Sequence, residues 1–420
     1  MTTSDTYTES FVWVWLPDAT EPIVAGKLEQ DGENLVFAYG RSYLEREDAI
    51  SLYDPELPLR PGVLPLLNGL STPNCIRDAA PDAWGRRVII NRKTGLTGRA
   101  ADAASLNELT YLHESGSDRI GALDFQSSPT DYKAREKTAA SLKELMDSAK
   151  RVEQGVPLTP ELDLALFHGS ALGGARPKAL INDEVTKYIA KFSATNDTYS
   201  VLKGEYIAMR LADVVGLDVA PVRLVEAAGK DVLLIERFDR KLTQAGWQRR
   251  ALVSALTLME LDEMMARYAS YEQFAEIIRL RFSNPKQTLE EMYGRMIFNI
   301  LCGNTDDHAR NHAAFWDGKQ LSLTPAYDIC PQGRAGGEAS QAMSLIGGSN
   351  LSKLSICIDA APLFLLNKQK ARALIEKQTQ LITDNWDVIC DEANLSEVDR
   401  AYFWKRQFLN SYVFEGFLEA

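Results

Sequence analysis

Short apolar runs and turn residues dominate the first 130 residues, which indicates a mixed region built from many short strands. Phe11–Leu16 and Asn34–Tyr39 are typical of buried strands. A clearer helix is predicted over 138–154, where apolar residues three or four positions apart share one face. That face consists of Leu142, Leu145, Met146, Ala149 and Val152. Gly155 and Pro157 end the helix, and we place the boundary between the two halves of the chain near them.

Helices and strands alternate in the middle of the chain, and helices dominate after about residue 250. Thr186–Phe192 is a predicted strand, and Glu205–Val215 is a predicted helix. Val219–Glu226 and Asp231–Arg237 are predicted to pair as a hairpin around Gly229-Lys230.

An amphipathic helical face over Leu289–Leu301 leads directly into a glycine and a polar loop. Two predicted strands follow this loop, Ala313–Trp316 and Leu321–Thr324, and they flank the hairpin sequence Asp317-Gly318. Residues 330–352 are rich in Gly and Ser and predict an exposed, mobile loop.

Composition narrows the class of protein. A chain of 420 residues with 45% hydrophobic residues can fold as two or three globular domains. Its formal net charge of -12 disfavours direct nucleic-acid binding by this chain alone, although a basic stripe or a basic partner would reverse that. Five cysteines without a C-x-x-C pair argue against a disulfide framework and a zinc site. With neither a signal-peptide pattern nor an apolar run of about 18 residues, we expect a cytoplasmic protein without membrane spans.

The polar loop carries the strongest chemical signal. Asp306 and Asn311 are five positions apart, as in the D-x-x-x-x-N catalytic loop of protein kinases. We predict that Asp306 accepts or orients the proton of an acceptor hydroxyl, and that Asn311 gives a carbonyl oxygen to Mg²⁺. Asp328 follows the hairpin, where the second metal carboxylate of a kinase would fall. Asp307 competes with Asp306 as the base, but the five-residue spacing favours Asp306; His308 is expected to shape the turn.

ATP-dependent transfer also requires a phosphate cradle and a cation. The cradle candidate is Ser170–Lys178, where the backbone of Gly173, Gly174 and Ala175 can approach phosphate oxygens and Lys178 adds positive charge. It is not a Walker A motif, and a plain structural turn fits the pattern equally well.

The cation candidate is Lys191, which resembles the strand lysine of kinases and could pair with Glu205 on the next helix. By itself, Lys191 would equally be an ordinary edge-strand lysine. Glu236 and Phe238 fall where a kinase hinge meets adenine, with Phe238 as the apolar ring. The alternative for this segment is a strand end with an Asp–Arg pair.

Together these segments resemble the HipA family of serine/threonine kinases, the toxins of type II HipBA toxin–antitoxin systems. The matching segments are Leu172–Lys178, Ile189–Lys191, Glu236–Arg240, Gly303–Asn311 and Ala326–Asp328, with Ile76–Arg87 and Asp118–Leu123 in the N-terminal half. The resemblance implies an α+β fold: a two-lobed kinase-like core with a mostly helical C-terminal lobe, preceded by a β-containing N-terminal subdomain. It divides the chain into the N-terminal subdomain 1–135, an N-lobe 136–250 and a C-lobe 251–420.

The resemblance also implies function. It implies Mg-ATP binding, phosphorylation of a protein such as an aminoacyl-tRNA synthetase, growth inhibition and persistence. It implies a HipB-like DNA-binding antitoxin as partner, through which the complex would contact nucleic acid. Family members autophosphorylate a serine in the glycine-rich loop. Here the aligned position is Ala171, so Ser170 takes that role one residue earlier or the loop is not regulated in this way.

Two other functions remain open from sequence. A small-molecule kinase of the aminoglycoside or lipid type has a related core, although the N-terminal resemblance argues against it. A non-catalytic, nucleotide-binding subunit of a repressor complex is the other alternative, although the retained site residues argue against it.

Overall fold

The computed structural model describes residues 7–96, 106–135, 141–154, 156, 176–195, 197–334 and 336–417. The chain groups into two compact units. Unit 1 contains 1–196, 225–253 and 316–319, and unit 2 contains 197–224, 254–315 and 320–420. The three segments predicted from the sequence follow other boundaries and stay a prediction. None of the described helices is both long and apolar enough to span a membrane.

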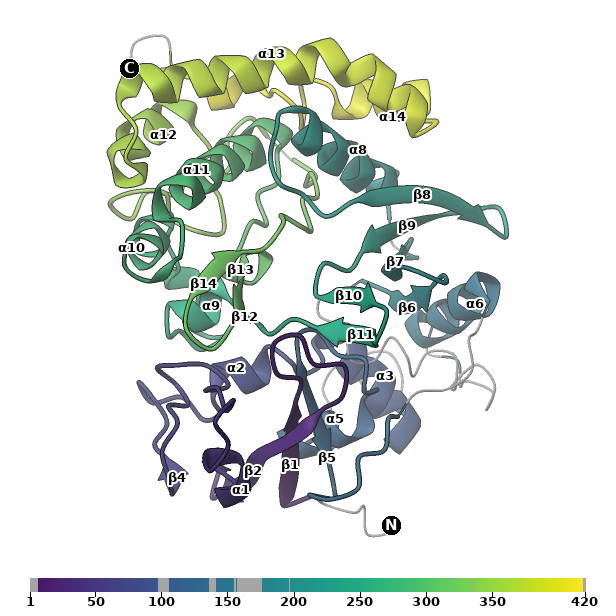
Figure 1. The fold of residues 1–420 in the computed structure, drawn as a ribbon. Coiled ribbons are helices and arrows are strands. Elements are labelled where there is room, and N and C mark those ends of the chain that lie inside the picture. The colour runs from purple at the N-terminus through teal and green to yellow at the C-terminus, as the bar shows by residue number, and fades with distance from the viewer. Residues whose placement is uncertain are drawn as a thin grey trace. The chain divides into compact units, whose positions relative to one another are not determined.

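Among the described residues, unit 1 contains a five-stranded sheet, most of a four-stranded sheet, a two-stranded sheet and several short helices (Figure 1). In chain order its elements are β1 (Glu9–Val14), β2 (Ile23–Asp31), β3 (Asn34–Tyr39), α1 (Arg41–Leu44), β4 (Val63–Leu64), α2 (Asn74–Arg77), α3 (Ala83–Thr94), α5 (Glu108–Glu114), β5 (Leu123–Gln126), α6 (Leu142–Glu153), β6 (Lys178–Asn182), β7 (Lys187–Phe192), β9 (Lys230–Glu236), β10 (Arg240–Thr243) and β11 (Gly246–Arg249). The first sheet has the strand order β4-β3-β2-β1-β5, and its pairs are antiparallel. The strands predicted near residues 11 and 34 are therefore confirmed.

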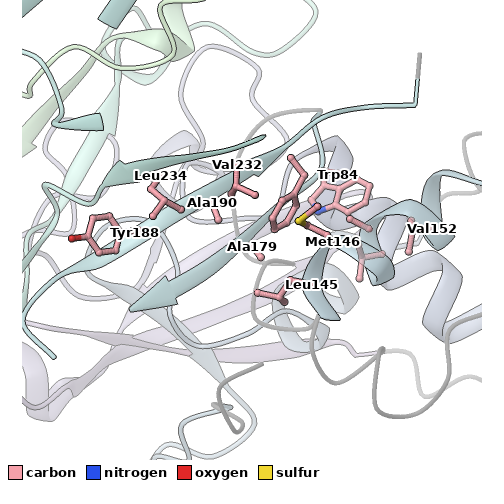
Figure 2. Close-up of a cluster of buried hydrophobic side chains, with 12 residues drawn as sticks. Trp84, Leu145, Met146, Val152, Ala179, Tyr188, Ala190, Val232 and Leu234 are labelled. Atoms are coloured by element: carbon pink, nitrogen blue, oxygen red, sulfur yellow. The ribbon is translucent and has the colours of Figure 1, made fainter. Parts of the chain in front are cut away.

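The second sheet of unit 1 has the order β6-β7-β9-β8, where β8 (Val222–Ala227) begins in unit 2. One face of this sheet packs against α3 and α6 (Figure 2). The buried cluster consists of Trp84, Val88, Leu145, Met146, Ala149, Val152, Ala179, Tyr188, Ala190, Phe192, Val232 and Leu234. The predicted apolar face of the helix near 145 thus meets a sheet, and a Ser141–Glu144 capping box begins that helix.

Unit 2 is mainly helical, as predicted for the end of the chain (Figure 1). Its elements are α8 (Val201–Val214), α9 (Ala255–Leu258), η1 (Ala266–Tyr268), α10 (Tyr271–Arg281), α11 (Pro285–Cys302), η2 (Ala309–Asn311), β14 (Leu321–Leu323), α12 (Leu354–Ala360), η3 (Ala361–Phe364), α13 (Lys368–Glu392), α14 (Glu397–Phe403) and η4 (Ser411–Phe414). Two further boundaries between the units fall within strands, namely β12 (Leu252–Ser254) and β13 (Ala313–Trp316). The strands β13 and β14 are the ones predicted around Asp317-Gly318.

The core of unit 2 lies around α11, which contacts α10, α12 and α13. Met292, Met296 and Leu301 are fully buried, as the predicted helical face requires. One prediction for this unit was wrong. The segment 330–352 is irregular, but it is not simply exposed, because Met343 and Leu345 are fully buried. Gly and Ser content indicated a loop and could not show that two apolar side chains anchor it.

Candidate active site

Helix α11 leads into the candidate catalytic loop through a left-handed cap at Gly303. Gly303 has φ 71°, a conformation that glycine adopts without strain, and its N–H donates to the Ile300 carbonyl. A Cβ at this position would lie 2.7 Å from the backbone oxygen of Gln407. The next residue, Asn304, is held twice, because its backbone N–H and its side-chain Nδ2 each bond to Asn299 at 2.9 Å. The loop therefore leaves the helix in one fixed direction.

The two adjacent aspartates of the loop have different environments. Asp307 is 2% exposed, and its carboxylate accepts the Tyr271 hydroxyl proton and lies 2.9 Å from Nε2 of His312. Asp306 is exposed. Of the two candidate bases, Asp306 is therefore the one open to an incoming hydroxyl, and its role as the base stays a prediction. Tyr271 and His312 were not identified from the sequence.

The electrostatic environment of Asp306 favours a proton acceptor. Partial desolvation raises the pKa of its carboxyl group, and the carboxylates of Asp328 and Asp307 raise it further, while His308 lowers it. A base with a raised pKa holds a proton more readily at neutral pH than an ordinary aspartate does. The backbone of His308 also closes the turn, because its carbonyl accepts the Asn311 N–H at 2.8 Å.

Asn311 and Asp328 belong to the same unit as Asp306 and supply oxygen atoms. Nδ2 of Asn311 donates to the Asp306 carbonyl at 3.4 Å, so the amide oxygen Oδ1 is left for another contact. Asp328 has a left-handed backbone with φ 60°, and the preceding Tyr327 donates its hydroxyl proton to the Arg310 carbonyl at 2.7 Å. This bond ties the end of the hairpin to the candidate catalytic loop.

The oxygen atoms of Asn311 and Asp328 decide whether this site suits a magnesium ion. No cluster of three or more His, Cys, Asp or Glu residues that could hold a metal occurs among the described residues. One amide oxygen and one carboxylate suffice where nucleotide phosphates and waters complete the octahedral shell of Mg²⁺. Asn311 and Asp328 match that chemistry and do not match a preformed site for a soft metal.

Lys191 belongs to unit 1 and lies on β7, opposite Lys178 on β6 and Leu233 on β9. Because Tyr188, Ala190 and Phe192 pack in the cluster of Figure 2, the alternation of the strand places Lys191 on the other face of the sheet. It is buried. Glu205 is buried on α8 of unit 2, and its predicted pairing with Lys191 stays a prediction.

The predicted phosphate cradle is described only at its end. Ser170, Gly173, Gly174 and Ala175 lie outside the described residues, so their roles stay predictions. Lys178 is buried at the start of β6, and its carbonyl accepts the Trp84 indole N–H at 3.1 Å.

The segment predicted as a hinge runs from the end of β9 into a turn. Glu236 ends β9 and lines a cavity of about 410 Å³ together with Lys187, Lys241 and Trp247. Phe238 is half-buried in the following turn. The Asp–Arg pair also exists, and it belongs to a larger ion network. Contact of Glu236 and Phe238 with adenine stays a prediction.

That ion network joins residues 118–121 to residues 237–240 in unit 1. Asp118 contacts Lys187 at 2.7 Å, Arg240 at 2.8 Å and Arg237 at 3.0 Å. Asp239 contacts Arg237 and Arg240, each at 2.9 Å, and accepts the Gly121 N–H at 2.8 Å. Burial alone would raise the pKa of Asp118, but the three cations hold it well below its usual range.

Comparison with known proteins finds two family models that match this chain. The HipA N-terminal domain matches residues 14–126, and the HipA-like C-terminal domain matches residues 170–386. The protein Y4mE of Sinorhizobium fredii is 26% identical over 334 residues, which cover 73% of this chain and 74% of that protein. The serine/threonine-protein kinase toxin HipA of Shewanella oneidensis is 28% identical over 141 residues, which cover 30% of this chain and 33% of that toxin.

A solved complex of Shewanella oneidensis HipA, HipB and operator DNA contains a chain with the same fold. Its TM-score is 0.68 at 19% identity, and the match covers 98% of both chains. This likeness confirms the predicted α+β, kinase-like fold. Since the C-terminal family model alone matches slightly more than half of the sequence, the chain belongs to the HipA family.

Proposed function

We propose that this protein is a Mg-ATP-dependent serine/threonine protein kinase. The observation that carries the proposal is the contrast within the loop, where Asp307 is sequestered and Asp306 is exposed beside Asn311 and Asp328. The name of the Shewanella relative, a serine/threonine-protein kinase toxin, supports it.

Each residue has a distinct task in this proposal. Asp306 receives or orients the proton of the acceptor hydroxyl, and its raised pKa suits that task. Asn311 and Asp328 would hold Mg²⁺ through oxygen atoms, and Lys178 and Lys191 would offer positive charge to the phosphates. Glu236 and Phe238 would meet the adenine, and the backbone of Gly173, Gly174 and Ala175 would cradle the phosphates. Bound Mg-ATP would supply the phosphoryl group and neutralise its developing charge.

We further propose that the protein is the growth-inhibiting toxin of a toxin–antitoxin pair. Its target would be a translation-related protein such as an aminoacyl-tRNA synthetase, and the kinase would act in the cytoplasm. A HipB-like antitoxin would hold it, as the solved HipA–HipB–DNA complex suggests for a chain of the same fold. The acidic net charge of -12 fits DNA contact made mainly through that partner. Ser170 is the proposed autophosphorylation site.

The test is transfer of label from γ-labelled ATP, with Mg²⁺, to proteins of a cell lysate. Asp306→Asn should abolish protein labelling, whereas Asp317→Asn, an exposed aspartate of the hairpin turn, should not. Label on a metabolite would favour a small-molecule kinase. Equal labelling by the wild type and Asp306→Asn would refute Asp306 as the base. Growth arrest on induction that Asp306→Asn relieves would support the toxin assignment, and mass spectrometry of Ser170 would test its modification.

A further inference from the structure

Three buried side chains form a closed hydrogen-bonded group behind the catalytic loop. Tyr271 is the first residue of α10, Asp307 belongs to the loop, and His312 precedes β13. All three are at most 3% exposed. One carboxylate oxygen of Asp307 accepts the Tyr271 hydroxyl proton, and the other lies 2.9 Å from Nε2 of His312. Both oxygens of Asp307 are therefore occupied inside the protein.

The two partners of Asp307 are themselves fixed by the backbone. The N–H of Tyr271 donates to the Ser344 carbonyl at 2.9 Å, and the carbonyl of His312 accepts the Ala255 N–H at 2.7 Å. The rings of Tyr271 and His312 meet edge to face, with centroids 5.6 Å apart. Asp307 is thus connected to α10, to the start of β13 and to the segments around 255 and 344.

Asp306 has no comparable support of its own. Across the residues that the structure describes, its carboxylate accepts no hydrogen bond, and its one hydrogen bond is made by its backbone carbonyl. The direction of the exposed carboxylate therefore depends on the backbone that it shares with Asp307. A shift of about 1 Å in a reacting group can cost roughly 100-fold in rate.

We infer that Tyr271 and His312 act through Asp307 as positioning residues that hold Asp306 in its reactive direction. This inference rests on the proposed kinase function. The D-x-x-x-x-N pattern of Asp306 and Asn311 assigns no role to Asp307, and this inference gives it one. Asp307 would set the geometry of the loop without touching the substrate.

A pair of matched tyrosine variants tests the inference. Tyr271→Phe removes the hydroxyl that bonds to Asp307. Tyr293→Phe, within α11 of the same unit, removes an equally buried hydroxyl that donates to the Cys357 carbonyl at 2.9 Å. We expect both variants to lower the thermal midpoint by similar amounts. Well below that midpoint, only Tyr271→Phe should lower kcat, by roughly 10- to 100-fold, with the KM for ATP within about twofold of the wild type.

Hydrogen exchange separates this inference from the proposed function. Amides of residues 304–311 should exchange faster in Tyr271→Phe and at the wild-type rate in Tyr293→Phe. If the wild type transfers no phosphate, the kinase proposal fails, and the exchange rates still decide whether the group positions the loop. Equal kcat values for the two variants, or unchanged loop exchange in Tyr271→Phe, would overturn the inference.

Discussion

Replacing Asp239 by Asn tests how much the buried ion network stabilises unit 1. Asp239 is 2% exposed and neutralises Arg237 and Arg240, whose guanidinium groups would otherwise face each other with only Asp118 between them. Removing one partner of a buried ion pair costs about 3–5 kcal/mol. Burial alone would raise the pKa of Asp239, but the two arginines lower it to about 2. At roughly 1.4 kcal/mol per pKa unit, the drop in the pKa of Asp239 from its ordinary value of 3.8 to about 2 corresponds to about 2 kcal/mol of stabilisation of the folded state.

Hydrogen exchange of the segments around 120 and 235 reports the local opening free energy, which suits a chain of two units that need not unfold in one step. Asp131→Asn is the control, because Asp131 pairs with Lys133 and both side chains are more than 60% exposed. If the local opening free energies of Asp239→Asn and Asp131→Asn differed by less than about 1 kcal/mol, the reasoning would be refuted. Since the folded pKa is depressed, the stabilisation is present above pH 3.8 and should disappear as the pH falls toward 2.

Two further substitutions probe the cap of α11 and a buried histidine. Gly303→Ala should lower the thermal midpoint more than Gly216→Ala does. Both glycines have positive φ, but only at Gly303 would a Cβ meet backbone, at 2.7 Å from the Gln407 oxygen, so equal midpoints would contradict the proposed collision. Burial lowers the pKa of His113 to about 4, so the wild type should lose about 3 kcal/mol as the pH falls from 6.5 through 4. His113→Gln should lose less free energy of unfolding over this pH range, as measured by urea titration at each pH. Parallel plots of unfolding free energy against pH for the two proteins would contradict the lowered pKa of His113 as the cause.

Local spacing made part of the site predictable. Asp306 and Asn311 lie between a helix and a hairpin that the hydrophobic pattern also predicts, and Asp328 follows that hairpin, 22 positions after Asp306. The structure places these three residues in one unit. Patterns of this kind are readable because helix, turn and strand periods act over a few residues.

The supporting contacts could not be predicted, because they join residues far apart in sequence. Tyr271 and Asp307 are 36 positions apart, and Asp118 and Arg237 are 119 positions apart. No local period links such pairs, and only tertiary packing decides which charges share a buried site. The wrong prediction of an exposed loop near Met343 has the same cause.

The ion network between residues 118–121 and residues 237–240 bears on whether the N- and C-terminal regions can be expressed separately. The two family models suggest two separable modules, one ending at 126 and the other beginning at 170. Expression of the C-terminal region alone would remove Asp118 and the Gly121 amide, and would leave Lys187, Arg237 and Arg240 with the single carboxylate of Asp239. The C-terminal region expressed alone is therefore expected to be less stable than the same region within the full chain, because the three cations of the network lose one of its two carboxylates.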